Sequence, residues 1–468
     1  MKIFKKTATL ILAAAVLLCG CSITNDKEEI PETTDTVQES VSSEISAPES
    51  TESVPPAPKE TREDFIARIN DYDSKYFVKK LNDNLLKYFS IIYLNVVNFN
   101  NDIDFGTKIK ASDLDNMMYL LNYDCPELIH LTGDYMPKYV DEEQQTVSGV
   151  RLWFIMDKEF YNTAVKQLDD FITDLQEKVK DQNELQRELY IYDYLFNNTI
   201  YNETELYSGS IYGTIINHKG RCEGLCKSFM WCMRKLGNEC LCVSGMPKWE
   251  TTSVYSSHSW NIVKIDGEYY HLDITVDNMN AAEGEHNPPT YGFFNVTDSF
   301  VLESRTIEKT YTDLGIPACT DESKNYHIRK GLIIRKTDDI KTAFFNMLRR
   351  KFKENSFDNI TIKFDDTENY NNVVQNINEY LKEFFAKYSI TGYTYTTYCN
   401  QLSRTMVLYC DAESLQLQED SQAVITDEPI SDDNIEPVEE STDIPPDEQQ
   451  EQVDNNEMLP SENWEQQE

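Results

Sequence analysis

The sequence is poor in basic residues, with 43 Lys and Arg against 81 Asp and Glu in 468 residues. Proteins that bind nucleic acids need clustered basic side chains that displace counterions from the phosphates, so we set this class aside. Most of the acidic excess lies in two flanks. Residues 411–468 hold 20 acidic residues and no Lys or Arg, and residues 22–58 hold nine acidic residues and one Lys. The body between them is an ordinary acidic domain.

The apolar run near the start of the chain, from Ala8 to Cys19, is too short to span a bilayer comfortably. Three Lys precede it, which is the layout of an export signal. The run ends in Leu18-Cys19-Gly20-Cys21, which resembles the lipobox of bacterial lipoproteins. We therefore predict a signal peptide over residues 1–21, lipidation of Cys21, and an extracytoplasmic body anchored to the bacterial cell membrane. A plain signal peptide or an uncleaved anchor is the alternative, and it gives the same compartment.

Both flanks of the body lack the apolar residues that a folded core needs. Residues 22–58 consist largely of Ser, Thr, Glu and Pro, with almost no aromatic side chains. Such a composition cannot bury enough apolar surface to offset chain entropy. We predict that residues 22–58 form a disordered, self-repelling linker and that residues 411–468 form a disordered acidic tail.

Residues 59–180 are predicted to form an α-rich region. Apolar side chains recur at helical spacing between about residues 60 and 99, for example at Phe77, Leu81, Leu85 and Tyr88. Residues 151–156 have the pattern of a strand. Residues from about 157 to 198 have the pattern of two helices.

Residues 317–410 show a different pattern that predicts a small α+β domain. Its expected strands and helices lie near residues 329–335 (strand), 338–353 (helix), 358–364 (strand), 367–387 (helix), 390–398 and 403–410 (strands). We find no catalytic constellation among its residues, and the simplest role for it is interaction or support.

The stretch 217–245 places a cysteine at the start of a helix. From about Cys222 the apolar residues recur at helical spacing, and Arg234 and Lys235 fall in the last turn, with Gly237 just beyond it. Basic residues and a left-handed glycine are typical of a helix C-terminus. A thiol at the other end faces the positive pole of the helix dipole, which favours the nucleophilic thiolate. The alternative is a buried structural thiol.

Residues 258–265 and 268–274 flank Asp266-Gly267, which predicts a hairpin with a two-residue turn. Pairing across this turn places His258 opposite Thr275 and Trp260 opposite Asp273. Because side chains alternate along a strand, His258 and Asp273 become diagonal neighbours on one face, at roughly 7 Å between Cβ atoms or less. The imidazole and the carboxylate can therefore form a hydrogen bond.

A helix-terminal Cys, a strand His and a carboxylate that orients the His match the nucleophile, base and orienting group of covalent catalysis. The order Cys222, His258, Asp273 resembles that of the transglutaminase-like superfamily. The stretches that carry the resemblance lie within residues 190–280: IYDYLFNNTIYN, IYGTIINHKGRCEG, HSWNIV and YYHLDITVD. Helical segments upstream, ending in Cys125-Pro126-Glu127, are also similar to bacterial relatives.

The resemblance implies an α+β protein with a papain-like core over residues 181–316, in which a helix carrying the Cys packs on an antiparallel sheet. It also implies a cysteine enzyme with Cys222, His258 and Asp273 as its triad, acting on amide or peptide bonds of peptides or proteins. For a surface lipoprotein we favour hydrolysis over cross-linking, with cell-wall peptides as one candidate substrate. No cofactor is required, and the only expected membrane contact is the lipid anchor.

Three further side chains are candidates for supporting roles. An oxyanion donor is needed, and the Cys222 backbone amide and Tyr212 are the candidates. Trp260 is expected to pack over the triad, and His271 is expected to support Asp273 or to fill the sheet. The resemblance is imperfect, since Leu225-Cys226 stands where relatives often carry Tyr-Ala and residues 276–278 replace a common Trp-Asp pattern.

The remaining cysteines do not define a bridge, because nine are left after Cys19 and Cys21 and connectivity cannot be read from sequence. Four of them cluster at Cys226, Cys232, Cys240 and Cys242, and clustered thiolates can bind zinc. Core packing or a disulfide is the favoured interpretation. At the level of function, the alternative to an enzyme is a surface-binding module that keeps the fold without catalysis.

Overall fold

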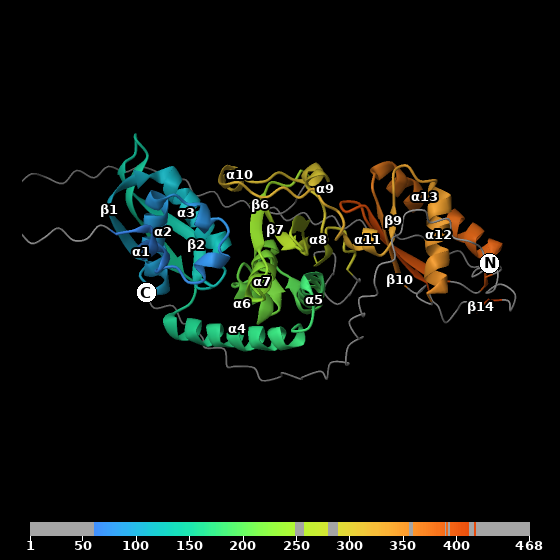
Figure 1. Cartoon of the computed structure of the whole chain (residues 1–468), viewed down its shortest axis with the longest axis horizontal. Coiled ribbons are helices and arrows are strands. Elements are labelled where there is room, and N and C mark those ends of the chain that lie inside the picture. Colours follow the sequence, from blue (N-terminus) through green and yellow to red (C-terminus); the bar gives the residue numbers. More distant parts are fainter. Residues whose placement is uncertain are drawn as a thin grey trace, which may run out of the picture. The chain divides into compact units, whose positions relative to one another are not determined.

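The computed structural model describes residues 60–248, 257–278, 289–354, 359–388, 390–391, 394–410 and 416–417. They form a mixed α/β structure with antiparallel sheets (Figure 1). The predicted signal peptide, Cys21, the linker and nearly all of the acidic tail lie outside the described residues. Among the residues that are described, no helix is both long and apolar enough to cross a bilayer.

The N-terminal part of the body combines helices with a three-stranded antiparallel sheet of order β1-β3-β2. The elements are α1 (Arg62–Ile66), α2 (Asp83–Val97), β1 (Asp102–Lys110), α3 (Ala111–Asp124), β2 (Leu131–Asp141) and β3 (Thr146–Phe154). The strand predicted at 151–156 corresponds to β3, whereas β1 and β2 were not predicted. Their register shifts against β3 interrupt the two-residue alternation by which a strand is recognised in sequence.

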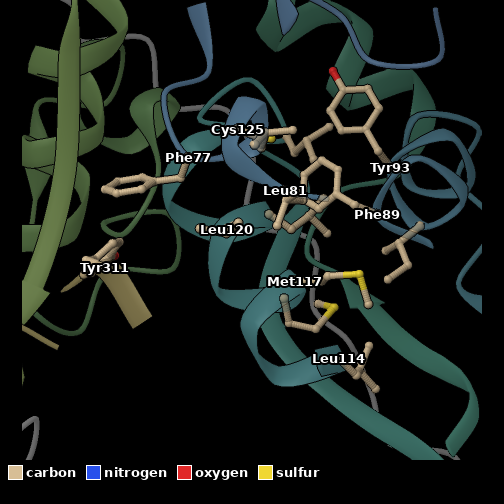
Figure 2. Close-up of a cluster of buried hydrophobic side chains, with 14 of the residues drawn as sticks. Phe77, Leu81, Phe89, Tyr93, Leu114, Met117, Leu120, Cys125 and Tyr311 are labelled. Atoms are coloured by element: carbon tan, nitrogen blue, oxygen red, sulfur yellow. The ribbon is translucent and has the colours of Figure 1, made fainter. Parts of the chain in front are cut away.

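Their spacing had suggested that the apolar residues between 60 and 99 lie on one helix, but they do not. Phe77 and Leu81 precede α2, which begins after Asn82 because the Asn82 side chain accepts the Leu85 amide at 3.0 Å. The Asp124 carboxylate accepts the Phe77 amide at 2.9 Å and so holds the preceding turn. Phe77 and Leu81 are nevertheless buried together in the core that Figure 2 shows.

The central part carries the predicted helix-on-sheet arrangement. Two helices, α4 (Lys158–Lys178) and α5 (Glu184–Asn198), confirm the prediction for 157–198. The sheet has the antiparallel order β6-β7-β8, with β6 at Cys240–Gly245, β7 at His258–Ile265 and β8 at Glu268–Leu272. Helix α7 (Cys222–Lys235) packs against β6 and β7. The other elements are β4 (Ile200–Tyr201), α6 (Ile211–Ile215), β5 (Lys219–Gly220), α8 (Thr275–Asn278), α9 (Asp298–Ser304) and α10 (Lys309–Leu314).

The hydrophobic core of the N-terminal part continues into the central part, where α7 buries its apolar side chains in a second core. Phe77 lies against Tyr311, with ring centroids 5.0 Å apart, so residues distant in the sequence meet there (Figure 2). An ion pair also joins the two parts, since Arg234 of α7 lies 2.6 Å from the buried Asp124 of α3. Helix α3 is thereby fixed against α7, the helix that carries Cys222.

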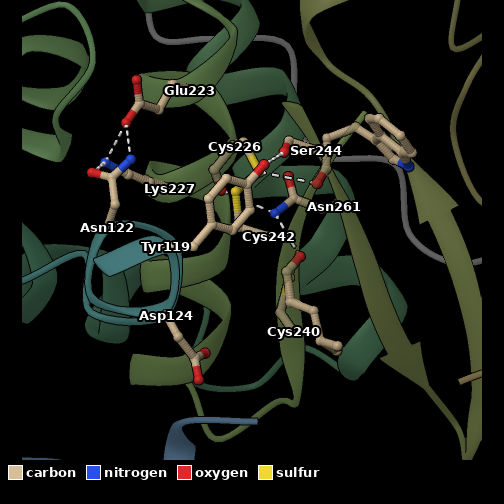
Figure 3. The surroundings of a disulfide bond; sticks show 12 residues. Tyr119, Asn122, Asp124, Glu223, Cys226, Lys227, Cys240, Cys242, Ser244 and Asn261 are labelled. Carbon is tan, nitrogen blue, oxygen red and sulfur yellow. Dashed lines mark hydrogen bonds and ion pairs between the residues drawn. A yellow bond between two sulfur atoms is a disulfide. The ribbon is translucent and has the colours of Figure 1, made fainter. Parts of the chain in front are cut away.

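A disulfide between Cys226 and Cys242 joins α7 to β6 (Figure 3). No particular bridge was predicted, although a disulfide was one of the favoured interpretations of the cluster. Cys232 and Cys240 are free and buried. A zinc site that uses all four cysteines is incompatible with this bridge, because two of the thiolates are consumed.

We expect removal of this bridge to lower the free energy of unfolding by about 3 kcal/mol, since it joins cysteines 16 residues apart in the sequence and restricts the unfolded chain. The double variant Cys226→Ala/Cys242→Ala tests this in urea unfolding. Its matched control is Cys232→Ala/Cys240→Ala, which removes two free thiols from the same helix and strand. An equal loss in both variants, or no effect of a reductant on the wild type, would contradict the expectation.

The C-terminal part contains helices and strands close to those predicted for it. Its main sheet has the order β12-β13-β10-β9, with β9 parallel to β10, and it buries a core of its own with two long helices. The elements are α11 (Tyr326–Arg329), β9 (Ile333–Ile334), α12 (Ile340–Lys353), β10 (Asn359–Phe364), α13 (Thr367–Lys387), β11 (Ile390–Thr391), β12 (Tyr395–Asn400), β13 (Thr405–Cys410) and β14 (Gln416–Leu417). The strand expected at 329–335 is shorter, because α11 occupies its start.

Candidate active site

Cys222 is the first residue of α7, as predicted. Arg221 precedes it with an extended backbone, and Gly237 follows the helix with φ of +86°. The first turn packs closely, since a Cβ on Gly224 would lie 2.1 Å from the Ser208 carbonyl oxygen. Cys222 is partly exposed, whereas the other free cysteines of the described residues, except Cys399, are buried.

Glu223 anchors the start of α7 to the N-terminal part. Its carboxylate accepts hydrogen bonds from Arg221 (2.6 Å), Lys227 (2.6 Å) and Asn122 of α3 (2.8 Å), and Figure 3 shows the last two. Burial alone would raise the pKa of Glu223, but the two cations lower it to about 2. The carboxylate is therefore charged at neutral pH, and it orients the turn that carries Cys222.

The predicted hairpin brings His258 and Asp273 together. Ile265 pairs with Glu268 across the Asp266-Gly267 turn, and both turn residues have positive φ. His258 Nε2 lies 2.7 Å from Asp273 Oδ2. The predicted hydrogen bond between these residues is therefore confirmed.

The pairing beyond the hairpin differs from the prediction. Strand β8 ends before Asp273, so Thr275 does not pair with His258 and Asp273 does not pair with Trp260. The Asp273 amide donates to the Phe293 carbonyl (3.1 Å), and Asp273 Oδ1 accepts the Thr275 amide (3.0 Å). Asp273 therefore lies between the end of β8 and the start of α8 at Thr275.

The buried pair His258 and Asp273 is held in its charged form. Burial by itself lowers the pKa of His258, but Asp273 and a hydrogen bond with the Cys222 side chain raise it to about 9. Burial raises the pKa of Asp273, yet the charges of His258 and Arg305 hold it well below its usual range. The His258 imidazole thus interacts with both the Asp273 carboxylate and the Cys222 side chain.

Trp260 packs on the imidazole, as predicted. Its ring is stacked on His258, with centroids 6.1 Å apart and an interplanar angle of 17°. The Trp260 Nε1–H donates to His271 Nδ1 at 3.0 Å, and His271 Nε2 lies 2.8 Å from Asp298 Oδ1. His271 therefore orients Trp260, and its expected support of Asp273 is corrected, because both ring nitrogens contact other groups.

The described contacts give Tyr212 no part in the site. Its ring packs against Phe160 and Tyr207, with centroids 5.5 Å apart in both cases. Another tyrosine, Tyr201, was not predicted from the sequence and lies nearer to Cys222. Tyr201 pairs with Gly220, two residues before Cys222, and Cys222 and Asp273 both act with burial to raise its pKa.

Arg305 is the second residue that the sequence did not reveal. It is fully buried, and its Nη1 donates to Asp273 Oδ2 at 2.5 Å. Its guanidinium lies over the rings of Trp260 and Phe293, at 4.9 and 4.6 Å from their centroids. No local pattern marks it, because Arg305 follows Asp273 by 32 residues and reaches it only through the tertiary fold.

One group of side chains among the described residues has donor atoms close enough to hold a metal ion. These atoms belong to His271, Asp298 and Cys319 and lie within 4.8 Å of one another. Hydrogen bonds already account for the arrangement, because Asp298 accepts from His271 and from the Cys319 amide (2.9 Å), and His271 accepts from Trp260. We therefore describe this cluster as a polar network behind the triad.

Comparison with known proteins identifies the central part. Residues 173–274 match the family model of the transglutaminase-like superfamily, so the chain contains a transglutaminase-like domain. The structure is similar to a candidate cysteine protease from Cytophaga hutchinsonii (17% identity, TM-score 0.21, 28% of this chain and 51% of that one). It is also similar to a TGase (18% identity, TM-score 0.20, 34% of this chain and 48% of that one). The chain thus matches about half the length of each. The comparison with curated proteins finds no match.

Proposed function

We propose that this protein is a lipid-anchored, extracytoplasmic cysteine enzyme that cleaves amide or peptide bonds with Cys222, His258 and Asp273. The observation that carries the proposal is that His258 interacts with the Cys222 side chain and forms a hydrogen bond with Asp273. The transglutaminase-like domain supports it at the level of the family. The anchor rests on the lipobox-like sequence that ends in Cys21.

In this mechanism the Cys222 thiolate attacks the carbonyl carbon of the amide and forms a tetrahedral oxyanion. The Cys222 backbone N–H is the proposed oxyanion donor, because the first N–H groups of a helix have no intrahelical acceptor. The His258 imidazolium gives its proton to the leaving amine, and a thioester remains on Cys222. Water, deprotonated by His258, then releases the carboxylic acid and restores the thiolate.

Hydrolysis is the outcome that we favour, on peptides or proteins at the cell surface, including cell-wall peptides. An amine in place of water would resolve the same thioester and produce a cross-link. The triad serves both outcomes equally, and the choice depends on which nucleophile reaches the thioester. No cofactor takes part in any of these steps.

We expect kcat/KM to fall above about pH 9. The proton that leaves with the amine comes from His258, and the pKa of this group is raised to about 9 from 6.5. The same shift stabilises the fold fully below about pH 6.5, and this contribution is lost as the pH rises through 9. Measurement of kcat/KM from pH 5 to 10.5 checks the first statement, and thermal unfolding of wild type and His258→Gln across that range checks the second. An alkaline limb near pH 7 would contradict the charged state that we assign to His258.

A thiol-directed electrophile tests the proposal without knowledge of the substrate. At pH 6 we expect iodoacetamide to modify Cys222 faster than Cys399, which is the exposed free thiol of the described residues and serves as an internal reference. Peptide mapping by mass spectrometry separates the two sites. In a binding module that kept only the fold, iodoacetamide would modify Cys399 first. This result would overturn the enzymatic proposal.

A further inference from the structure

We propose that Arg305 is a positioning residue of the triad, which binds Asp273 through the oxygen that His258 also uses and so limits how strongly the carboxylate attracts the His258 proton. This inference rests on the proposed function and assigns a role to a residue outside the segment that matches the family model. We expect it to govern the pH range in which the triad works.

The geometry places two cations on one oxygen. Asp273 Oδ2 accepts from His258 Nε2 at 2.7 Å and from Arg305 Nη1 at 2.5 Å. Asp273 is 2% exposed and Arg305 is fully buried, so water screens neither contact appreciably. The position of Arg305 is further restricted by the rings of Trp260 and Phe293, which its guanidinium contacts. Arg305 therefore acts on the triad through Asp273.

The backbone around Arg305 forms hydrogen bonds with the sheet that carries His258. Residues 304–308 continue beside the end of β6: the Lys248 amide donates to Ser304 O (2.8 Å), Thr306 to Met246 O (2.9 Å) and Glu308 to Ser244 O (2.9 Å). This approach requires Gly245, because a Cβ there would lie 1.6 Å from the Thr306 carbonyl oxygen. Gly245 is also the residue that pairs with His258 in β7.

A second cation on Asp273 has opposite effects on the two partners of the ion pair. It favours the charged carboxylate, because opposite charges attract, and it opposes a proton on His258, because like charges repel. The directions of the pKa changes agree with this reasoning, since Arg305 lowers the pKa of both groups. Among the described residues, the titratable groups that also interact with this cluster include Cys222, Tyr201, Tyr192, Asp277 and His271.

Titration of the His258 ring by NMR tests the inference directly, and the six histidines of the chain allow assignment by comparison with His258→Gln. In Arg305→Met we expect the midpoint of His258 to rise by about one pH unit, the lower end of the effect of a charge at this distance. Arg305→Lys restores the charge and is expected to return the midpoint most of the way to the wild-type value.

Two further variants distinguish the electrostatic effect of Arg305 from a general loss of structure. Arg305→Gln removes the charge but keeps an N–H donor for Asp273, and it is expected to raise the midpoint as Arg305→Met does. Arg404→Met removes another buried Arg that contacts a carboxylate, Glu303, and a ring, Phe300, and it is expected to leave His258 unchanged. A His258 midpoint equal to that of wild type in either folded neutral variant at position 305 would overturn the inference.

The outcome for Arg305 can be separated from the outcome for the proposed function. If Cys222 proves unreactive but the His258 midpoint moves in Arg305→Met, the electrostatic role stands and the enzymatic proposal fails. If Cys222 is reactive but the midpoint does not move, the enzyme stands and the role of Arg305 fails. Where turnover is measurable, both limbs of the kcat/KM profile should move to higher pH in Arg305→Met, a change that a purely structural residue would not cause.

Discussion

Replacing Cys222 by Ala is expected to reduce amide turnover by at least about 10³-fold, because loss of the nucleophile removes the covalent route and leaves only the binding and oxyanion contributions. The measurement is a pair of assays, peptide release and amine incorporation, on wild type and variant. The matched control is Cys232→Ala, which removes a buried free thiol from the same helix and should retain activity. Equal rates in wild type and Cys222→Ala would end the catalytic proposal.

The same pair of assays separates hydrolysis from cross-linking. Both reactions pass through the thioester on Cys222, so both should disappear in Cys222→Ala. A wild-type enzyme that releases peptide without incorporating a primary amine would support the hydrolysis that we favour. Efficient amine incorporation would instead identify a transferase with the same triad.

Replacing Asp273 by Asn is expected to lower kcat by ~10⁴-fold, because a neutral amide no longer holds the imidazole in its useful tautomer or stabilises the imidazolium. Stability should also fall by about 3–5 kcal/mol, since the buried Arg305 loses its charged partner. Assays of kcat and urea unfolding measure the two losses separately.

Asp298→Asn is the matched control for this variant. Asp298 also contacts a histidine Nε2, that of His271, at 2.8 Å, but it is partly exposed, and its histidine accepts a hydrogen bond from Trp260. We expect it to cost less stability and little activity. If both variants lost activity to the same extent, the special role of Asp273 would be contradicted.

Local sequence patterns were sufficient for the parts of the site that depend on neighbouring residues. The Asp266-Gly267 turn determined the register of β7 and β8 as far as the pair Asn261–Leu272, next to Asp273, because a two-residue turn leaves one way to pair its flanking strands. The positions of Cys222 and Gly237 likewise marked the two ends of α7. The C-terminal domain was predictable for the same reason, since its helices and most of its strands follow regular apolar spacing.

Long-range contacts decided what the local patterns could not. Phe77 and Leu81 are spaced as if on the helix of Leu85. The helix does not extend to them, because Asn82 caps its start and the carboxylate of Asp124 binds the Phe77 amide. Strands β1 and β2 were not predicted, because register shifts interrupt the alternation of buried and exposed side chains along them. The bond of the Asp273 amide to the Phe293 carbonyl likewise accompanies an end of β8 earlier than the hairpin pattern implied.

By itself, the sequence determined the three chemical groups of the proposed triad and the hairpin that joins two of them, because helix ends and tight turns depend on adjacent residues. Only the tertiary structure decided that Cys226 pairs with Cys242, that His271 supports Trp260 and that Arg305 reaches Asp273. Each of these contacts joins side chains whose distance in space is set by the packing of helix on sheet, which spacing along the chain does not encode.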